Sequence, residues 1–435
     1  MKKIKHTIAL VILAVSTSLA QELKLEEAIN IALTNNHNIV AAKQQELAIE
    51  KTIHRGAVGY LPKVDASGSL SYSDNISDQE FGGNAFPDIK GAEAVSGSTS
   101  AKVTASYVIF NGLTRSRSYT KLKESGKLSV LQTKISIEGT LLQVVNSYYD
   151  VVRKTEQRDL IEQSITISKD RLKRVETNYE FGNGSKINVL NAKVDFNNDS
   201  ASYINSDLAL KQAKHQLNYL LGRSIETVFT VSKEIEVPIA ESLDAYKEKA
   251  KSNNTSVILT EVQLNMAEID RKLSKSNFMP TISSQINYGY SGTANEVGVI
   301  QKSTSIGYTA SVSLSWNLFD GFKRKKALEQ AKILLDMNGT KRAQAVLNVE
   351  MELQNYYYSL TTNLSLIKLE TENLGLAELN LTKSKELLYN GSITNVQFRQ
   401  AQLNLIQVQN KINNYKYMSK IYEYQLMRLT DELVK

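Results

Sequence analysis

The chain has no cysteine among its 435 residues. It therefore has no disulfide, no thiolate metal site and no cysteine that could carry a lipid anchor. Proline and histidine are also rare, with four of each. Apart from a run near the amino terminus, no apolar stretch approaches the length of a transmembrane helix. An exported chain of this composition must gain its stability from packing and oligomerisation.

The amino terminus differs from the rest of the chain. Three lysines precede an apolar run over residues 8–15, and the small residues at 18–20 suit a cleavage site. This pattern predicts a secretory signal peptide over residues 1–20 and a mature start near Gln21. Removing those three lysines lowers the formal net charge from +7 to +4. The basic balance is therefore partly a targeting signal, and a nucleic-acid partner has little support.

The chain is internally duplicated, and the duplication is visible as pairs of identical residues at constant separation. Four pairs lie 209 residues apart: Phe110 and Phe319, Gly182 and Gly391, Ala192 and Ala401, Leu220 and Leu429. Upstream pairs lie 218 residues apart: Ala32 and Ala250, Asn36 and Asn254, Pro62 and Pro280. The change of separation falls between two predicted strands, where a loop absorbs it.

Each half contains a strand that leads directly into a very long helix. Apolar residues alternate with Ser, Thr and Gly over 306–316, which predicts a strand with one apolar face. The proline-free stretch from Lys323 to about Asn390 is rich in helix-forming residues. A helix of that length measures roughly 100 Å. The earlier half repeats the arrangement, with a strand over 101–110 and a helix from Leu113 to Phe181.

The predicted organisation follows the two repeats in order. We expect helices over 21–60, including one that reaches about Tyr60, and long loops over 74–100 and 292–303 inside the strand hairpins. The predicted segments are a signal peptide (1–20), helices (21–60), a first strand hairpin (61–112), a long and a returning helix (113–222), a linker with a small strand (223–241), helices (242–279), a second strand hairpin (280–321), and a second long and returning helix (322–435).

Four strands cannot close a barrel, and open strand edges are not tolerated in lipid. Three copies would supply twelve strands, within the even-numbered range of outer-membrane barrels. The sequence therefore predicts an α+β membrane protein with duplicated helical hairpins. Its trimer would form an α-barrel topped by a 12-stranded transmembrane β-barrel, with four strands from each chain.

The ordered set of duplicated motifs resembles the TolC-like outer-membrane efflux proteins over nearly the whole mature chain. The resemblance is carried by the Leu-Pro and Met-Pro strand entries at Pro62 and Pro280, by the Phe-Asn-Gly and Phe-Asp-Gly joints, and by the glycine–alanine spacing after each helix tip. It implies a homotrimeric channel-tunnel, with its barrel in outer-membrane lipid and its helices crossing the periplasm.

The resemblance also implies a function and partners. Such proteins are passive exit ducts of tripartite efflux pumps or type I secretion systems. A periplasmic adaptor (a membrane fusion protein) grips the helix tips, and an inner-membrane transporter of the RND, ABC or MFS type supplies the energy. The alternative is a soluble periplasmic coiled-coil scaffold or adaptor whose strands form a small sandwich. Strands that alternate aromatics with Ser, Thr and Asn favour the barrel.

The turns between the long helices are the best functional candidates, because such turns can move and be gripped. Plain chain reversal by glycine is the simpler alternative. The tip residues are Gly182, Asn183, Gly184 and Ser185 in the first half, and Asn390, Gly391 and Ser392 in the second. In relatives that this chain resembles, aspartates on the second tip favour cations. Those positions fall on Gln397 and Gln400 here, and on Asn188 and Asn191 in the first half. Amide side chains at these positions could close the periplasmic mouth of the channel, at the helix tips, through hydrogen bonds, and that closure would depend less on pH than one made by aspartates.

Two further residue sets are candidates for roles at the membrane. Aromatic residues on the strands predict a belt at the membrane interface, although strands favour aromatics for packing as well; they are Tyr72, Tyr107, Tyr288, Tyr290, Tyr308 and the single tryptophan, Trp316. The predicted strand–helix joints contain Pro62, Phe110, Gly112, Pro280, Phe319 and Gly321.

Signals for an enzyme are poor. The glycines at 182 and 184 follow a helix and so lack the strand–loop–helix context of a phosphate site. No Gly-x-Ser-x-Gly motif stands at a strand end. The histidines show no metal-ligand spacing, and the many carboxylates lie on helices, where solvated faces are the simpler interpretation. We therefore predict a protein that is not an enzyme and binds no cofactor.

Overall fold

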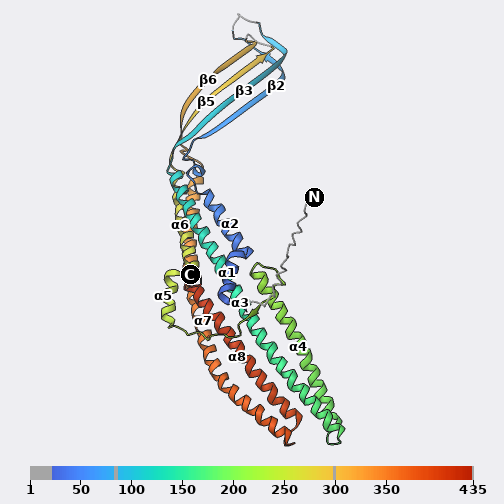
Figure 1. Ribbon diagram of the computed structural model, residues 1–435. Coiled ribbons are helices and arrows are strands. Elements are labelled where there is room, and N and C mark those ends of the chain that lie inside the picture. Colours follow the sequence, from blue (N-terminus) through green and yellow to red (C-terminus); the bar gives the residue numbers. More distant parts are fainter. Residues whose placement is uncertain (1–21, 83–86, 297–299, 434–435) are drawn as a thin grey trace, which may run out of the picture. The chain divides into compact units, whose positions relative to one another are not determined.

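The computed structural model describes residues 22–82, 87–296 and 300–433 (Figure 1). The predicted signal peptide lies outside the described residues. The elements in chain order are β1 (Glu22–Leu23), α1 (Leu25–Asn35), α2 (His37–Thr52), the 3₁₀ helix η1 (Arg55–Val58), β2 (Lys63–Gln79), β3 (Ile89–Asn111), α3 (Thr114–Glu180), α4 (Lys186–Leu220), β4 (Thr230–Val231), α5 (Leu243–Asn253), α6 (Thr255–Ser276), β5 (Thr281–Asn295), β6 (Lys302–Ser315), α7 (Lys323–Tyr389) and α8 (Asn395–Leu429).

Equivalent helices of the two repeats have equal lengths, as the duplication in the sequence predicts. Helices α3 and α7 have 67 residues each, α4 and α8 have 35 each, and α1 and α5 have 11 each. The two long helices lie within one residue of the ends expected from the absence of proline and the content of helix-forming residues. Helical propensity over so long a window is informative even though each residue contributes little.

The chain divides into two compact units. The tip unit comprises residues 22–43, 133–255 and 347–433, and the sheet unit comprises the described residues of 44–132 and 256–346. The tip unit contains the turns between the long helices. The sheet unit contains the four long strands and the helix segments next to them in the chain.

The core of the tip unit consists of two equivalent clusters, one from each repeat. Val144, Val151 and Leu217 are fully buried in the first cluster, and Leu353, Leu360 and Leu426 occupy the same places in the second. Each pair is separated by the 209 residues of the duplication. The sequence therefore places one hydrophobic stripe on each long helix, and each stripe is buried against the returning helix of its own repeat.

An asparagine ends the first short helix of each repeat in the same way. The Asn36 side chain donates to the Leu220 carbonyl at 2.6 Å, and Asn254 donates to the Leu429 carbonyl at 3.0 Å. The Asn36 side-chain oxygen also accepts from the backbone N–H groups of Asn38 and Ile39, at 2.9 and 3.2 Å. One residue thus ends α1 and caps α2.

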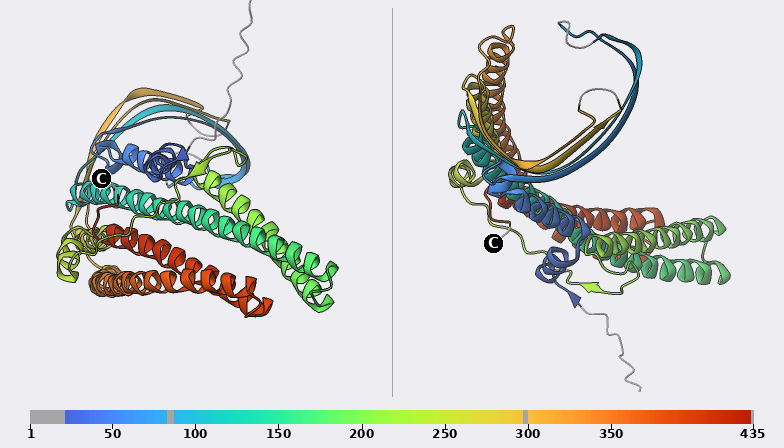
Figure 2. Two further views of the ribbon diagram at one scale, coloured as in Figure 1. Left: turned by 60° about the horizontal axis from the view of Figure 1, so that its bottom comes forward. Right: turned by 90° about the horizontal axis from the view of Figure 1, so that it is seen from above.

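The four long strands form one antiparallel sheet in the order β2-β3-β5-β6. The two hairpins are therefore neighbours, joined through the β3–β5 pair. The sheet is curved rather than flat, as two further views show (Figure 2). Its outer strands, β2 and β6, each lack a strand partner on one side within the described residues.

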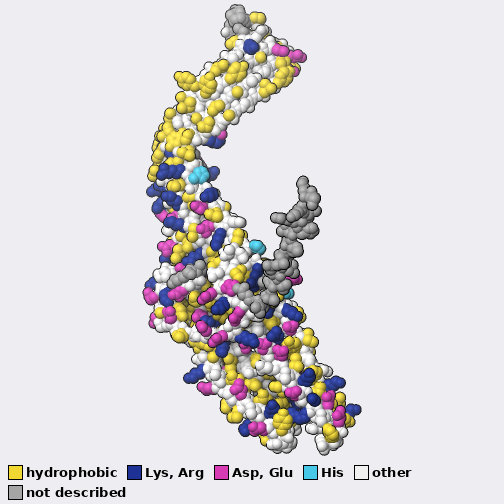
Figure 3. Space-filling view, viewed as in Figure 1, with side chains coloured by type: hydrophobic (Ala, Val, Ile, Leu, Met, Phe, Trp, Pro, Cys, Tyr) yellow, Lys and Arg dark blue, Asp and Glu magenta, His cyan; other side chains and the backbone are white. Residues whose placement is uncertain are grey.

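The two faces of the sheet differ sharply in chemistry. Register places Leu70, Val103, Ile286 and Tyr308 on one face, where Leu70 is 83% exposed and Tyr308 is 80% exposed. The opposite face carries mainly Ser, Thr, Gly, Asn and Gln. Three serine pairs cross from β2 to β3 there, and the Ser71–Ser98 pair is typical, with its hydroxyl oxygens 2.7 Å apart. Apolar side chains accordingly gather over the sheet in the space-filling view (Figure 3).

Three expectations from the sequence were wrong in their bounds. The loop expected over 74–100 is shorter, because β2 continues to Gln79 and β3 begins at Ile89. The loop expected over 292–303 is also shorter, since β5 ends at Asn295 and β6 begins at Lys302. Ser and Gly have weak strand propensity, and here the ladder of the neighbouring strand overrides it.

The third correction concerns the helix expected to reach Tyr60. Helix α2 ends at Thr52, and the His54 side chain accepts from the Ala57 N–H at 3.1 Å to start a 3₁₀ turn. Gly59 closes that turn at a φ of 80°. In the linker, the expected small strand is β4, which pairs in parallel with β1, a contact that the sequence did not predict.

Candidate functional site

The two turns between long helices are built in the same way. Gly182 and Gly391 adopt positive φ angles of 77° and 71°. After each glycine the next N–H reaches back five residues, from Asn183 to the Asn178 carbonyl at 2.9 Å and from Ser392 to the Leu387 carbonyl at 2.9 Å. These are Schellman motifs, in which glycine avoids the steric cost of the left-handed conformation.

The returning helices start with different caps. The Ser185 hydroxyl accepts from the Ile187 N–H at 3.4 Å. Thr394 and Gln397 form a complete capping box: Thr394 accepts from the Gln397 N–H at 3.3 Å, and the Gln397 side chain accepts from the Thr394 N–H at 2.8 Å. The Gln397 side chain therefore caps the amino terminus of its own helix, α8, in this conformation.

The remaining amides predicted for the mouth lie in two different places. Gln400 donates to Asn404 one turn along its own helix, at 2.9 Å. Asn188 and Asn191 line a cleft of about 270 Å³ between α3, α4 and α8. The structure therefore brings two of the four amides together and leaves the other two in local bonds.

A charged network that the sequence analysis missed links the two helical hairpins beside that cleft. Arg399 of α8 contacts Asp199 of α4 through two bonds, of 2.8 and 2.5 Å. The Ser164 hydroxyl of α3 donates to Asp199 at 3.1 Å, and Gln402 of α8 donates to Ser164 at 2.9 Å. Three helices from both repeats thus meet at one carboxylate.

A second ion pair continues the network. Arg171 is only 1% exposed and donates to Asp195 at 2.5 Å. Burial lowers the pKa of Arg171 from its ordinary value, and Asp195 acts in the opposite direction. Arginine keeps its charge under such shifts, so this is a buried cation held by one carboxylate.

The sequence held a signal for this network in the places where the duplication breaks. The positions equivalent to Arg171, Asp195 and Asp199 in the second half are Asn380, Asn404 and Val408. The position equivalent to Arg399 in the first half is Leu190. The charged residues that connect the two hairpins therefore have uncharged equivalents in the other repeat. The contact between the hairpins is asymmetric for that reason.

The strand–helix joints contain a second repeated device. Gly112 and Gly321 have φ angles of 65° and 66°, and the following residues, Leu113 and Phe322, have φ angles of 68° and 69°. Each joint therefore passes from strand to helix through two consecutive left-handed residues. A Cβ on Gly112 would lie 2.6 Å from the Ser276 carbonyl oxygen, whereas one on Gly321 would meet nothing within 4 Å.

An arginine braces each joint. Arg115 donates to the Gly59 carbonyl at 3.0 Å, and Arg324 donates to the Asn277 carbonyl at 3.3 Å. Their guanidinium groups lie 5.2 Å from the Tyr60 ring and 5.3 Å from the Phe278 ring, respectively. The two sets are equivalent in the duplication, so the same brace is built twice. Pro62 and Pro280 follow these contacts and precede β2 and β5, and Phe110 and Phe319 precede the joint glycines.

The predicted aromatic belt residues share the apolar side of the sheet but lie at several heights. Tyr107 pairs with Ser284 near the helices, whereas Tyr72 pairs with Gly97, which lies ten residues before Tyr107 in β3. That separation is about 33 Å at ~3.3 Å per residue. Three more lie between those heights: Tyr288, Tyr290 and Tyr308. Trp316 follows β6 and donates to the Phe278 carbonyl at 3.1 Å.

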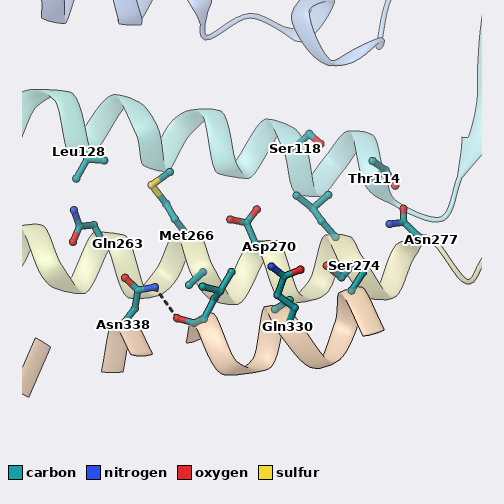
Figure 4. A pocket seen from close by; sticks show the side chains of 15 residues that line it. Thr114, Ser118, Leu128, Gln263, Met266, Asp270, Ser274, Asn277, Gln330 and Asn338 are labelled. Atoms are coloured by element: carbon teal, nitrogen blue, oxygen red, sulfur yellow. Dashed lines mark hydrogen bonds between the residues drawn. The ribbon is translucent and has the colours of Figure 1, made fainter. Parts of the chain in front are cut away.

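A cleft in the sheet unit lies among α3, α6 and α7 and measures about 760 Å³ (Figure 4). Its lining mixes amides, small residues, leucines, a methionine and one carboxylate, Asp270, which Lys121 contacts at 2.5 Å. Asn338 donates to the Leu334 carbonyl of its own helix. Within the described residues there is no group of three or more His, Cys, Asp or Glu that could hold a metal ion.

Helices offer no membrane span: within the described ranges, none combines the length and the apolar character that crossing a bilayer requires.

Comparison with known proteins gives a consistent family. The model of the family described as "Outer membrane efflux protein" matches residues 28–223 and 247–431. The chain is 20% identical over 161 residues to the outer membrane protein TolC of Vibrio cholerae, a match that spans 37% of this chain and 37% of that relative.

Solved structures share the fold over almost the full length. A membrane protein from Pseudomonas aeruginosa has a TM-score of 0.79 at 14% identity, with 96% of this chain and 94% of that chain covered. CusC has a TM-score of 0.77 at 15% identity, covering 94% and 92%. The outer membrane protein VceC of Vibrio cholerae has a TM-score of 0.74 at 13% identity, covering 94% and 96%.

Proposed function

The chain belongs to the outer membrane efflux protein family, and on that premise we propose that it is the passive exit duct of a tripartite efflux pump or a type I secretion system. It is an outer-membrane protein whose helical part lies in the periplasm. Three copies would close a 12-stranded β-barrel continuous with an α-helical tunnel. A periplasmic adaptor would grip the helix tips, and an inner-membrane transporter would drive export.

The observation that carries this proposal is the chemistry of the two sheet faces. One face exposes large apolar side chains along all four strands, including Leu70, Ile286, Tyr308 and Val312. A soluble monomer rarely exposes so large a contiguous apolar surface. The opposite face is lined by hydroxyl and amide groups. Apolar residues outside and polar residues inside are what a lipid-embedded, water-filled barrel requires.

Closure by three copies is supported by the open strands β2 and β6. Both present unpaired backbone groups within the described residues, and such groups are costly in lipid. If β6 of one copy pairs with β2 of the next, no edge remains. The serine pairs of the polar face would then lie towards the water-filled interior.

The helix tips are the proposed docking and gating region. Glycine-closed turns and a cleft of about 270 Å³ lie close to a charged network that joins both hairpins. Breaking that network would free one hairpin to move relative to the other within the tip unit. We therefore assign the tip residues to adaptor contact and opening.

Cysteine labelling tests the proposal directly, because the natural chain has no cysteine. Glu80→Cys and Glu296→Cys place thiols beyond the strand ends remote from the joints, and Ser392→Cys places one at a helix tip. Intact cells are treated with a maleimide too bulky to cross the outer membrane. We expect the first two variants to react in intact cells and the third only after lysis.

Two further results bear on the same proposal. Extraction of the protein from membranes should require detergent. The purified protein should have the mass of a trimer in native mass spectrometry. Release by salt washing, together with no labelling before lysis, would support the soluble scaffold instead.

A further inference from the structure

Positive charge is concentrated in one band of the sheet unit, where the strands end and the helices begin. We call this band the basic collar and define it as residues 51–65, 112–127, 268–276 and 320–332. It contains sixteen Lys and Arg but only six Asp and Glu, a net charge of +10. Residues 21–435 together carry +4, so the chain outside the collar carries −6. The collar is therefore a specific accumulation of charge, not a reflection of overall composition.

The six carboxylates of the collar do not neutralise its positive charge. All six are ion-paired within the collar, as in the Lys121–Asp270 and Arg324–Asp320 pairs. The excess of ten cations thus remains after every internal carboxylate is used. Even lysines that contact these carboxylates reach into solvent: the side chains of Lys63, beside Asp65, and Lys326, beside Glu329, are 76% and 75% exposed. Dark blue side chains crowd the helix segments next to the sheet in Figure 3.

Helix stability does not explain this charge. The first turn of α7 consists of four basic residues, Lys323 to Lys326, and neither α3 nor α7 has an acidic residue in its first turn. Cations at a helix amino terminus oppose the helix dipole and destabilise the helix. The basic residues at the start of α7 therefore lower the stability of their helix, which the Asp320 carboxylate offsets only in part by accepting from the Arg324 N–H at 3.1 Å.

Aromatic residues are interleaved with these cations at the end of the sheet where the helices begin. The Arg115 guanidinium lies 5.0 Å from the ring of Tyr107. Phe278 lies under Arg324 and accepts from Trp316 through its carbonyl. Phe319 and Phe322 stack edge to face at 5.5 Å, and both are exposed. Cations beside aromatic rings at the end of an apolar surface are suited to the boundary between acyl chains and phosphates.

We propose that the basic collar binds the phosphate groups of anionic phospholipids in the leaflet where the strands meet the helices. The lipid acyl chains would lie on the apolar sheet face, and Lys323, Lys325 and Lys326 would contact the headgroups. This contact would fix how deeply the strands sit in the bilayer. The proposal rests on the proposed function, since it requires the strands to be in lipid.

Trp316 supplies a native probe, because it is the only tryptophan in the chain and lies next to the collar, where it donates to the carbonyl of Phe278, the residue whose ring lies under Arg324. The full chain is reconstituted in phosphatidylethanolamine vesicles with brominated phosphatidylglycerol or brominated phosphatidylcholine at equal fraction. Bromine on the acyl chains quenches tryptophan fluorescence on contact. We expect phosphatidylglycerol to quench Trp316 with an apparent preference of about threefold to tenfold at low salt. The preference should vanish near 1 M salt, where the Debye length is about 3 Å.

A collar variant and a matched control test the residues. Lys323→Gln, Lys325→Gln and Lys326→Gln together remove three charges but leave the bracing Arg324 in place. The control carries Lys173→Gln, Lys186→Gln and Lys193→Gln, three exposed lysines of the tip unit. The collar variant should lose most of the preference for phosphatidylglycerol, and the control should retain it.

Each contrary result has a distinct meaning. Equal quenching by both lipids would overturn the collar proposal while leaving the barrel intact, and the charge would then belong to a contact with another acidic macromolecule. Equal loss in both triple variants would overturn it as well, because net charge alone would then explain the preference. Absence of quenching by either lipid would instead contradict the proposed function.

Discussion

The Asp199–Arg399 pair offers the sharpest test of how the two hairpins are held together. Asp199→Asn keeps the size of the side chain but removes the charge that Arg399 contacts at 2.5 and 2.8 Å. Both side chains are largely buried, with 9% and 13% of their area exposed. The variant leaves a guanidinium in the helix interface without its carboxylate.

The expected magnitude follows from that burial. Removing one partner of a buried ion pair destabilises by about 3–5 kcal/mol, because the other charge is left uncompensated. Some solvent reaches Arg399, so we expect the lower end, about 3 kcal/mol, for local opening of the hairpin contact. Removing both charges in Asp199→Asn with Arg399→Gln should cost less than the sum of the two single changes. The coupling energy should be about 1–3 kcal/mol.

Amide hydrogen exchange of the detergent-solubilised protein is the appropriate assay, because it reports local opening without global unfolding. A loss of about 3 kcal/mol corresponds to roughly a hundredfold faster exchange in the segments around residues 195–203 and 397–405. The clusters around Leu217 and Leu426 should exchange as in the unmodified protein. Lys193→Gln, an exposed change on the same helix, serves as the control.

Additive effects of the two substitutions would show that Asp199 and Arg399 do not hold the hairpins together as a pair. If the double variant exchanged as fast as the sum of the two single effects predicts, the two charges would not be coupled. If Asp199→Asn left exchange unchanged, the pair would contribute no more than an exposed surface pair. In both cases the assignment of this network as the link between the hairpins would be wrong.

Three further predictions concern single positions. Gly112→Ala should lower the thermal midpoint more than Gly321→Ala, because both strain the backbone by about 1–3 kcal/mol but only the first adds a backbone clash; equal shifts would contradict this. Burial raises the pKa of Glu138 above 4.5, so the folded state binds the extra proton and stability falls as pH rises from 4.5 through the folded pKa. Glu138→Gln should therefore gain stability relative to the unmodified protein at neutral pH but not below pH 4.5, which thermal midpoints across pH will check. Thr394→Ala removes the capping box and should cost about 1 kcal/mol, seen as faster exchange of the Gln397 amide, with Ser392→Ala as a control that leaves the cap intact.

The sequence alone determined the repeated elements, because each depends on local chemistry at constant spacing. The absence of proline over long stretches predicted the two long helices, and the alternation of apolar and polar residues predicted the strands. Glycines occupy the positive-φ positions at both tips and both joints. The family resemblance followed from the same ordered pairs, and the match over residues 28–223 and 247–431 agrees with it.

Strand length was decided by the fold. Ser, Gly and Ala over 89–100 give no strand signal, yet these residues form ladder bonds to β2 and, from Ser96 onward, to β5 as well. A neighbouring strand supplies hydrogen bonds whatever the side chain, so pairing extends beyond the reach of propensity.

The long-range polar contacts were not predicted from the chain. Arg399 and Asp199, which belong to different repeats, are separated by 200 residues, and Arg115 and Gly59, both in the first repeat, by 56. A periodic pattern predicts which face of a helix is buried, but it does not say which polar side chains on two such faces meet. That choice depends on the relative rotation and height of packed helices. Only the tertiary structure of each unit fixes those quantities, because they result from packing summed over many side chains.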